Sequence, residues 1–520
     1  MRFAPISNLM GWTLTVVSIP MAIIGLIGFI IDDMSKEYII RAFFVPIVLG
    51  LITGLLMIWK TRDKFDQEDG VRDREAVTAV ALGWLLVIFF GAMPYWLGGT
   101  FHGPFTYIEG NSSFVQMSHG LLHSWFESMS GFTTTGATVI DSTTSPICVA
   151  VSDCIGSQPK SLLLWRSTTQ WLGGMGVIML SILILGRWIG GGLTLAREEL
   201  TGPSLSRLGP KLQQTAAFLW GVYTILTIVE FLLLFFVAKI GMFDSINHAL
   251  TTMASGGFST HDAGIMYFDS FVVESIIIVF MILTGLNFSL FHIAYHGDLK
   301  EALKDQELRI YLSVLFLAWI AMTFSLTTAG GQGFVESARA ALFQATSIGT
   351  STGYASADYA VWPVLSLLTL LFLMIVGASA GSTSGGLKIM RLKIAYEIVR
   401  QEIGRIVQPR QVRSIRMNGS VVDQTKVQVV LGMLSAWAVS AVLGTTLIAI
   451  VEYDLDLTSV ISVVVSCLGN TGPALGVFGP TATWGSMHPI SMFASTMMMW
   501  IGRLEILTVL VVFNPRAWRL

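Results

Sequence analysis

Long apolar runs dominate the hydrophobic pattern of this chain, and polar or charged stretches separate them. Ten runs are long enough, at roughly 20 residues each, to cross a lipid bilayer as helices. They occupy residues 9–31, 38–59, 76–98, 162–185, 214–238, 270–292, 309–328, 362–396, 427–451 and 490–513. The first run is too long for the apolar part of a secretory signal, and no A-x-A site follows it, so we expect a retained span. The pattern predicts an all-α polytopic membrane protein.

Four shorter apolar segments lie between these runs, and each ends in a polar stretch centred on glycine. They cover residues 118–131, 244–254, 335–348 and 457–468. At about 12 residues each they are too short to span a bilayer. Irregular backbone at membrane depth is tolerated only where protein buries it or where it lines a watery cavity. Each segment with its glycine stretch is therefore predicted to be a half-length helix followed by a re-entrant loop.

The four glycine stretches can be aligned glycine on glycine, at spacings of about 121, 96 and 119 residues, which indicates an internal repeat. Glycine lets the backbone turn its carbonyls inward without a side chain in the way. A ring of such oxygens can replace the water around a dehydrated cation. We therefore expect a selectivity filter built from Thr134, Thr135 and Gly136; Ser255, Gly256 and Gly257; Thr352, Gly353 and Tyr354; and Asn470, Thr471 and Gly472.

The repeat divides the chain into five parts. Residues 1–75 contain two apolar runs without a glycine stretch and are predicted to form an accessory transmembrane hairpin, in which Gly50 and Gly54 would allow close helix packing. The four repeats that follow are predicted to cover residues 76–200, 201–300, 301–420 and 421–520.

Charge sets the expected orientation. The chain is 53% hydrophobic and 12% charged, about half the charge of a soluble protein. Lysine and arginine gather in alternate loops, most densely between Lys388 and Lys426, whereas residues 99–113, 254–269, 350–361 and 473–489 contain neither. By the positive-inside rule, the basic loops and both termini are cytoplasmic and all four glycine stretches face outside. Cys148 and Cys154 then share an outer loop, where an oxidising environment would let them form a disulfide, although two free thiols remain an alternative.

Two features at membrane depth have alternative explanations. The ten residues 377–386, GASAGSTSGG, interrupt an apolar run; they include Gly377, Gly381, Ser382, Thr383, Gly385 and Gly386. Small residues at these spacings suit tight helix packing, but their density also suits a flexible loop that gates a pore. Arg503 lies inside the last apolar run, where a charge needs a cavity or a partner. It would either pair with a carboxylate on a neighbouring helix or face the pore.

The other polar residues in the apolar segments do not indicate a further functional site. His119, His123 and Glu127 share one face of the first half-length helix, but no other ligand cluster supports a zinc site there. Structural pairing or snorkelling suffices for Arg166, Glu230 and Arg339. We find no paired catalytic residues at membrane depth and no nucleotide-binding G-x-G-x-x-G motif, so we expect neither an enzyme nor a cofactor in this chain.

The run SLLLWRSTTQWLGGMG at residues 161–176, taken with FTTTGAT at residues 132–138, resembles the Trk/Ktr/HKT superfamily of potassium transporters. The two extra N-terminal runs resemble its TrkH-type branch, and the resemblance covers essentially the whole chain. It implies four K+ channel-like M1-P-M2 repeats around one pore in a bacterial inner-membrane protein. It also implies a homodimer on a cytosolic, nucleotide-binding TrkA-like ring, in contact with membrane lipid and not with nucleic acid. In the family, an arginine matching Arg503 projects into the pore below the filter.

The resemblance also assigns the transported ion. Potassium would be held by the carbonyls of Thr135, Gly136, Gly256, Gly257, Thr352, Gly353, Thr471 and Gly472. Family members with serine at the first filter glycine conduct sodium, and Gly136 therefore favours potassium. A sodium-permeable protein, or a potassium symporter coupled to Na+ or H+, remains the alternative. A secondary transporter built on inverted repeats would need two broken spans in corresponding halves, whereas this sequence indicates one strong break, in the third repeat.

Overall fold

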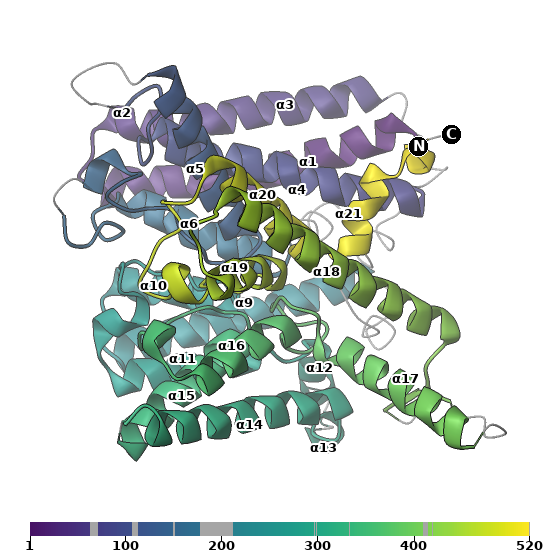
Figure 1. Cartoon of the computed structure of the whole chain (residues 1–520). Coiled ribbons are helices and arrows are strands. Elements are labelled where there is room, and N and C mark those ends of the chain that lie inside the picture. The colour runs from purple at the N-terminus through teal and green to yellow at the C-terminus, as the bar shows by residue number, and fades with distance from the viewer. Residues whose placement is uncertain are drawn as a thin grey trace.

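A computed structural model of the chain shows an almost entirely helical protein (Figure 1). It describes residues 1–62, 71–106, 113–148, 151–176, 212–295, 297, 299–331, 333–408, 414–418 and 420–518. The chain begins with a hairpin in which α1 (Phe3–Ile31) packs on a second span made of α2 (Lys36–Ile39), η1 (Ile40–Phe44) and α3 (Val45–Thr61). Gly54 lies against the backbone of Gly11 on α1, and Gly50 lies against Ser18, so both glycines allow the close packing that the sequence predicts.

Four similar units follow the hairpin, each made of a long helix, a half-length helix, a loop and a further helix. Their elements are α4 (Asp73–Leu97), α5 (Phe114–Phe132) and α6 (Lys160–Gly174); α9 (Leu212–Phe236), α10 (Met242–Met253), α11 (Phe271–Thr284) and α12 (Ser289–Tyr295); α14 (Gln306–Thr328), α15 (Phe334–Gly349) and α16 (Val364–Val376); and α18 (Gln424–Val451), α19 (Leu457–Gly469), α20 (Pro489–Arg503) and α21 (Ile506–Phe513). The units are joined by connecting elements. These are the short helix α13 (Leu299–Ala302), the longer helix α17 (Ile389–Val407) and a hairpin of β1 (Arg416–Met417) and β2 (Ser420–Val421).

The half-length helices lie where the sequence predicts them. Three have nearly the predicted bounds, whereas α5 is longer than expected, at 19 residues. Its extra first turn is stabilised by a capping box, in which Ser113 accepts a hydrogen bond from the Gln116 backbone and the Gln116 side chain accepts one from the Ser113 backbone. This turn, residues 114–117, lies before the predicted start of the segment at residue 118.

The helices that follow the loops are broken in more than the third repeat, and here the sequence prediction is wrong. Helices α11 and α12 meet at 95°, and α20 and α21 meet at 115°. Residues 285–288 and 504–505 form these bends inside runs that stay apolar overall, so hydropathy does not reveal them. In the third repeat α16 ends at Val376 and α17 begins only at Ile389, so residues 362–396 are not one span.

Six helices of the described part are long and apolar enough to cross a membrane, or up to eight if each bent pair is one span. The two remaining predicted spans, residues 162–185 and 362–396, begin with the shorter helices α6 and α16. Residues 177–185 lie outside the described residues. The long helices differ in burial: 72% of the apolar window of α4 is buried, but only 11% of that of α18. Helix α18 therefore presents most of its apolar surface outward.

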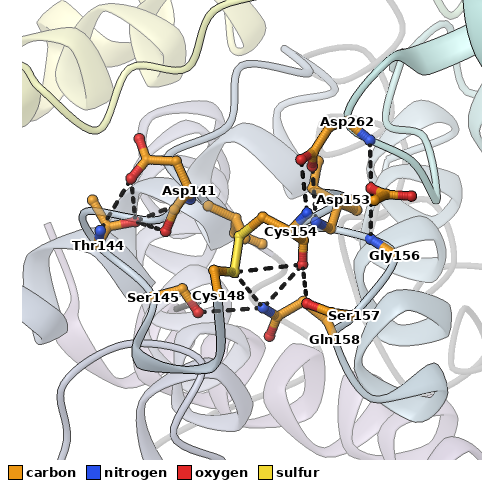
Figure 2. Close-up of a disulfide and its surroundings, with 12 residues drawn as sticks. Asp141, Thr144, Ser145, Cys148, Asp153, Cys154, Gly156, Ser157, Gln158 and Asp262 are labelled. Atoms are coloured by element: carbon orange, nitrogen blue, oxygen red, sulfur yellow. Dashed lines mark hydrogen bonds between the residues drawn. A yellow bond between two sulfur atoms is a disulfide. The ribbon is translucent and has the colours of Figure 1, made fainter. Parts of the chain in front are cut away.

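The outer loop of the first repeat contains a disulfide between Cys148 and Cys154, whose Cα atoms are 5.0 Å apart (Figure 2). Asp262, from the outer loop of the second repeat, accepts hydrogen bonds from the backbone N–H groups of Cys154 and Ile155 at 2.7 and 2.8 Å. Asp153 in turn accepts the Asp262 N–H at 3.0 Å. The disulfide loop is thus attached to the second repeat.

Candidate ion-conduction pathway

The backbone of the four glycine loops follows one pattern in all four repeats. Each aligned glycine is left-handed, at φ +86° for Gly136, +77° for Gly257, +82° for Gly353 and +99° for Gly472. Two residues earlier, each loop has a left-handed residue that is not glycine: Thr134, Ser255, Ser351 and Asn470, at φ 54°, 54°, 54° and 49°. Non-glycine residues adopt this conformation only at an energetic cost. Each loop thus combines a strained non-glycine residue with a left-handed glycine. Because this combination occurs four times, the loops indicate one repeated structure with a shared function.

Ser351 is a residue that the sequence interpretation missed. It occupies in the third repeat the position of Thr134 in the first, whereas the predicted Tyr354 lies one residue beyond the aligned glycine. The Tyr354 side chain is buried and its hydroxyl bonds to Thr251 on α10. Comparing the offset from each glycine would have identified Ser351.

Each loop is attached to the end of its own half-length helix by the same hydrogen bond. The backbone N–H one residue before the glycine donates to a carbonyl five residues earlier in the chain. These bonds are Thr135 N to Ser130 O at 2.9 Å, Gly256 N to Thr251 O at 2.9 Å, Thr352 N to Ser347 O at 2.8 Å and Thr471 N to Ser466 O at 3.0 Å. The carbonyl ends of four helices, which carry partial negative charge, thus lead into the four loops.

The four loops meet one another in a closed ring. A Cβ atom on Gly136 would collide with the carbonyl oxygen of Gly256, and one on Gly257 would collide with that of Thr352. A Cβ on Gly353 would likewise strike the Thr471 oxygen, and one on Gly472 the Thr135 oxygen. Each glycine therefore lies against a carbonyl of the next repeat, in the cyclic order one, two, three, four, one. Only glycine fits at these four junctions.

Cavities lie on both sides of the ring. One cavity, called the outer cavity after the orientation that the charge pattern predicts, is lined by Gly136, Gly257, Gly353 and Pro473, one residue from each repeat, together with residues that follow the loops. A second cavity, called the inner cavity, is lined by Gly174, Leu468, Arg503 and residues 381–382 and 384–388. The ring thus separates two hollows, which is the arrangement that a filter requires.

The predicted gate residues form an irregular loop, residues 377–388, which we call the third-repeat loop. Two hydrogen bonds connect it to the ring. The Thr383 hydroxyl bonds to the Ser255 hydroxyl at 2.9 Å, and the Gly385 N–H donates to the Ser351 hydroxyl at 2.5 Å. A Cβ on Gly385 would collide with the carbonyl of Gly469. The loop therefore touches three of the four repeats on the side of the ring opposite the outer cavity.

The same loop also bonds to the bend in the second repeat. Phe288 N–H donates to the Gly381 carbonyl at 3.0 Å, and Ser379 N–H donates to the Gly285 carbonyl at 3.1 Å. The carboxylate of Glu307, on α14, accepts the Ala380 N–H at 2.7 Å. These bonds satisfy backbone groups of the loop that form no hydrogen bonds within a helix. Backbone at membrane depth requires such partners because water is absent there.

Arg503 lies at the end of α20 and binds backbone carbonyls on two sides. Its guanidinium donates to Thr383 O in the third-repeat loop at 2.9 Å, and to Gly173 O and Gly174 O at the end of α6 at 2.6 and 2.9 Å. Glu505, two residues later, instead pairs with Arg391. Arg503 thus links the third-repeat loop to the first repeat.

Two residues of the first repeat, Arg166 and Glu127, form an ion pair, as structural pairing predicts for Arg166, and both also bond to residues that follow the glycine loops. Arg166 on α6, only 2% exposed, pairs with Glu127 at 2.6 Å, donates to the Ser259 carbonyl at 2.8 Å and lies over the Phe258 ring. Glu127 on α5 also accepts hydrogen bonds from the Thr138 hydroxyl and the Val139 N–H, both just after the first loop. Through these bonds the pair contacts the segments that follow the first and second glycine loops. Its members come from positions too far apart in sequence for a local pattern to pair them.

The other polar residues are placed as follows. Arg339 pairs with Glu274 at 2.8 Å, as a structural role predicts. Glu230 is completely buried, so snorkelling does not describe it. Among the described residues no group of three or more His, Cys, Asp or Glu side chains could hold a metal ion, and Glu127 is engaged by Arg166.

Known proteins share this architecture. Residues 42–519 match the TrkH family, described as cation transport protein. The Trk system potassium uptake protein TrkH of Escherichia coli strain K12 is 33% identical over 522 residues, covering 100% of both chains. The protein of the same name from Halomonas elongata is 32% identical over 92% of each chain. The crystal structure of the potassium transporter TrkH from Vibrio parahaemolyticus superposes with a TM-score of 0.81 at 28% identity, covering 100% of both chains. With its family profile, full-length relatives and fold in agreement, this multi-pass membrane protein belongs to the TrkH family of cation transport proteins.

Proposed function

We propose that this chain is the ion-translocating subunit of a bacterial potassium-uptake system. The observation that carries the proposal is the closed ring of four glycine loops between two cavities. A dehydrated cation passes through the ring and is coordinated by the carbonyl oxygens of the two residues at each junction: Thr135, Gly136, Gly256, Gly257, Thr352, Gly353, Thr471 and Gly472. Such a pathway needs no nucleophile and no acid–base pair.

Potassium is the ion that the chemistry favours. All four junctions carry glycine, so backbone carbonyls rather than a serine hydroxyl supply the ligands. The names of the full-length relatives, potassium uptake proteins of the Trk system, support the same ion. The competing proposals are a sodium-permeable pathway and a potassium symporter driven by Na+ or H+.

Rubidium uptake into liposomes that contain the purified protein tests this proposal. We expect uptake that runs down the rubidium gradient and that external potassium inhibits at least tenfold more effectively than external sodium. Faster uptake under an imposed inward proton or sodium gradient, at the same membrane potential, would identify a symporter. No uptake above empty liposomes, or equal inhibition by both ions, would contradict the proposal.

We further propose that the third-repeat loop is the gate. It lies between the ring and the inner cavity, and its bonds to Ser255, Ser351 and Arg503 support a position across the path of an ion. Its conformation rests on three left-handed glycines, Gly377, Gly381 and Gly386, at φ +66°, +75° and +76°. Flexible glycines of this kind let a segment rearrange at a small energetic cost.

Assembly and location complete the proposal. The protein lies in the bacterial inner membrane with both termini in the cytoplasm, as the distribution of lysine and arginine predicts. It forms a homodimer, to which the outward apolar face of α18 is suited, and it rests on a cytosolic nucleotide-binding ring of the TrkA kind. Native mass spectrometry, with and without the regulatory subunit from the same genome, tests both contacts. We expect a dimer that stays bound to the cytosolic nucleotide-binding ring. A monomer that never binds the regulatory subunit would contradict the proposed assembly.

A further inference from the structure

The second glycine loop departs from the four-fold pattern at one position. The residue before the aligned glycine is threonine in three repeats, Thr135, Thr352 and Thr471, but it is Gly256 in the second. In the first and third repeats this threonine also bonds to a threonine two residues earlier, hydroxyl to hydroxyl at 2.8 Å. The second repeat has Ala254 at that earlier position and can form no such bond.

A side chain from another repeat fills the vacant space. A Cβ on Gly256 would collide with the carboxamide of Gln170, a fully buried residue of α6 in the first repeat. The two ends of this carboxamide bind on either side of the loop's aligned glycine. Nε2 donates to the Gly256 carbonyl at 2.6 Å, and Oε1 accepts the Phe258 N–H at 3.1 Å.

The bonded carbonyl is one of the ring oxygens. Gly256 O is the atom that lies against Gly136 at the junction of the first and second repeats. A donor at hydrogen-bond distance fixes the direction of this carbonyl and draws on its electron density. It therefore alters the field that a cation would meet at this place, and selectivity depends on the number and field strength of the ligands. Arg166, one helical turn before Gln170, bonds to the Ser259 carbonyl, so both residues of α6 hold the same loop.

We infer that Gln170 is a specificity-determining positioning residue, which takes the place of the missing threonine and sets the Gly256 carbonyl in the ring. The inference rests on the proposed function, because it assigns a role within the filter. The four junctions are then unequal: three junction carbonyls belong to threonines, whereas the fourth belongs to Gly256 and accepts a hydrogen bond from a carboxamide of the neighbouring repeat.

The test compares potassium-over-sodium preference in rubidium uptake into liposomes. Gln170→Met keeps the side-chain volume but removes the carboxamide, and we expect it to lower the preference at least fivefold while the folded yield stays near that of the unaltered protein. Gly256→Thr alone should be worse, because its side chain collides with Gln170. The double variant Gln170→Ala with Gly256→Thr restores the threonine pattern in the vacated space, and it should recover preference relative to Gly256→Thr. Thr168→Ala is the matched control, since residues two apart on a helix do not face the same way.

The outcomes distinguish a failure of the proposed potassium function from a failure of the role inferred for Gln170. If the unaltered protein shows no potassium preference, the proposed function and this inference fall together. If it shows the preference and Gln170→Met keeps it within twofold, only the inference is overturned. A double variant no better than Gly256→Thr also overturns it, because the threonine would then not take over from the carboxamide in the vacated space. Gln170→Leu, which is also apolar and lacks both ends of the carboxamide, replaces Gln170→Met if that variant does not fold.

Discussion

Replacing Arg503 with alanine is expected to raise rubidium flux at least tenfold when no activating partner is present. The change removes the hydrogen bonds that tie the third-repeat loop to the carbonyls of Gly173 and Gly174. It also removes a fixed positive charge from the cavity beneath the ring. Two like charges about 4 Å apart repel by about 4 kcal/mol at an effective dielectric constant near 20, and a tenfold change needs only about 1.4 kcal/mol. Uptake into liposomes by the purified protein measures the effect.

Two further variants control this experiment. Shortening the third-repeat loop within residues 377–386 should act in the same direction, because the obstruction itself is removed. Arg41→Ala removes an arginine whose partner Glu37 lies one helical turn away and is exposed, so it should leave basal flux unchanged. If neither Arg503→Ala nor the shortened loop exceeds the basal flux of the unaltered protein, tight packing is the better explanation of this glycine-rich segment.

Serine substitutions in the ring are expected to change which ion enters. Gly136→Ser puts a Cβ against the Gly256 carbonyl at a left-handed position, and Gly353→Ser does the same against Thr471. The carbonyls must turn away, or the new hydroxyl takes their place, and either changes the ligand field. We expect Gly136→Ser to admit sodium while still carrying potassium, with a preference at least tenfold lower, equivalent to about 1.4 kcal/mol. Gly353→Ser should do likewise or abolish flux. Competitive uptake of the two ions in potassium-starved cells measures both.

The control for the ring is a serine at a glycine outside it. Gly221, on α9, has an ordinary φ, and a Cβ added there would meet no atom within 4 Å. Gly221→Ser should therefore leave ion preference and flux unchanged. An unchanged preference in both Gly136→Ser and Gly353→Ser, with protein present in the membrane, would remove the glycine loops from the ion path.

Much of the fold could be predicted because its signals are local. A run of apolar residues predicts a span, and a short run that ends in glycine predicts a re-entrant loop. The register of the ring was also accessible, since the four glycines that align in sequence all adopt left-handed backbone and lie at the four junctions. The disulfide follows from two cysteines in one outer loop.

The remaining features depend on contacts between distant residues. The bends after α11 and α20 lie within runs that are apolar overall, and the first of them is stabilised by a distant segment through the bond from Phe288 N–H to the Gly381 carbonyl. Gln170 and Gly256 are far apart in the chain, and only the folded structure shows that one fills the space beside the other. Structural pairing, as predicted for Arg166, is confirmed by its ion pair with Glu127, whereas its bond to the second loop joins residues far apart in the chain and has no local signal.

The central claim is that a dehydrated cation sits inside the ring formed by the four glycine loops. Anomalous scattering from crystals grown in rubidium tests it directly, because each bound ion gives its own density peak. We expect a peak on the axis between the carbonyls of Thr135, Gly256, Thr352 and Thr471, and a weaker or displaced peak in Gly136→Ser. A well-ordered ring without rubidium, in crystals that bind the ion elsewhere in the membrane region, would contradict it.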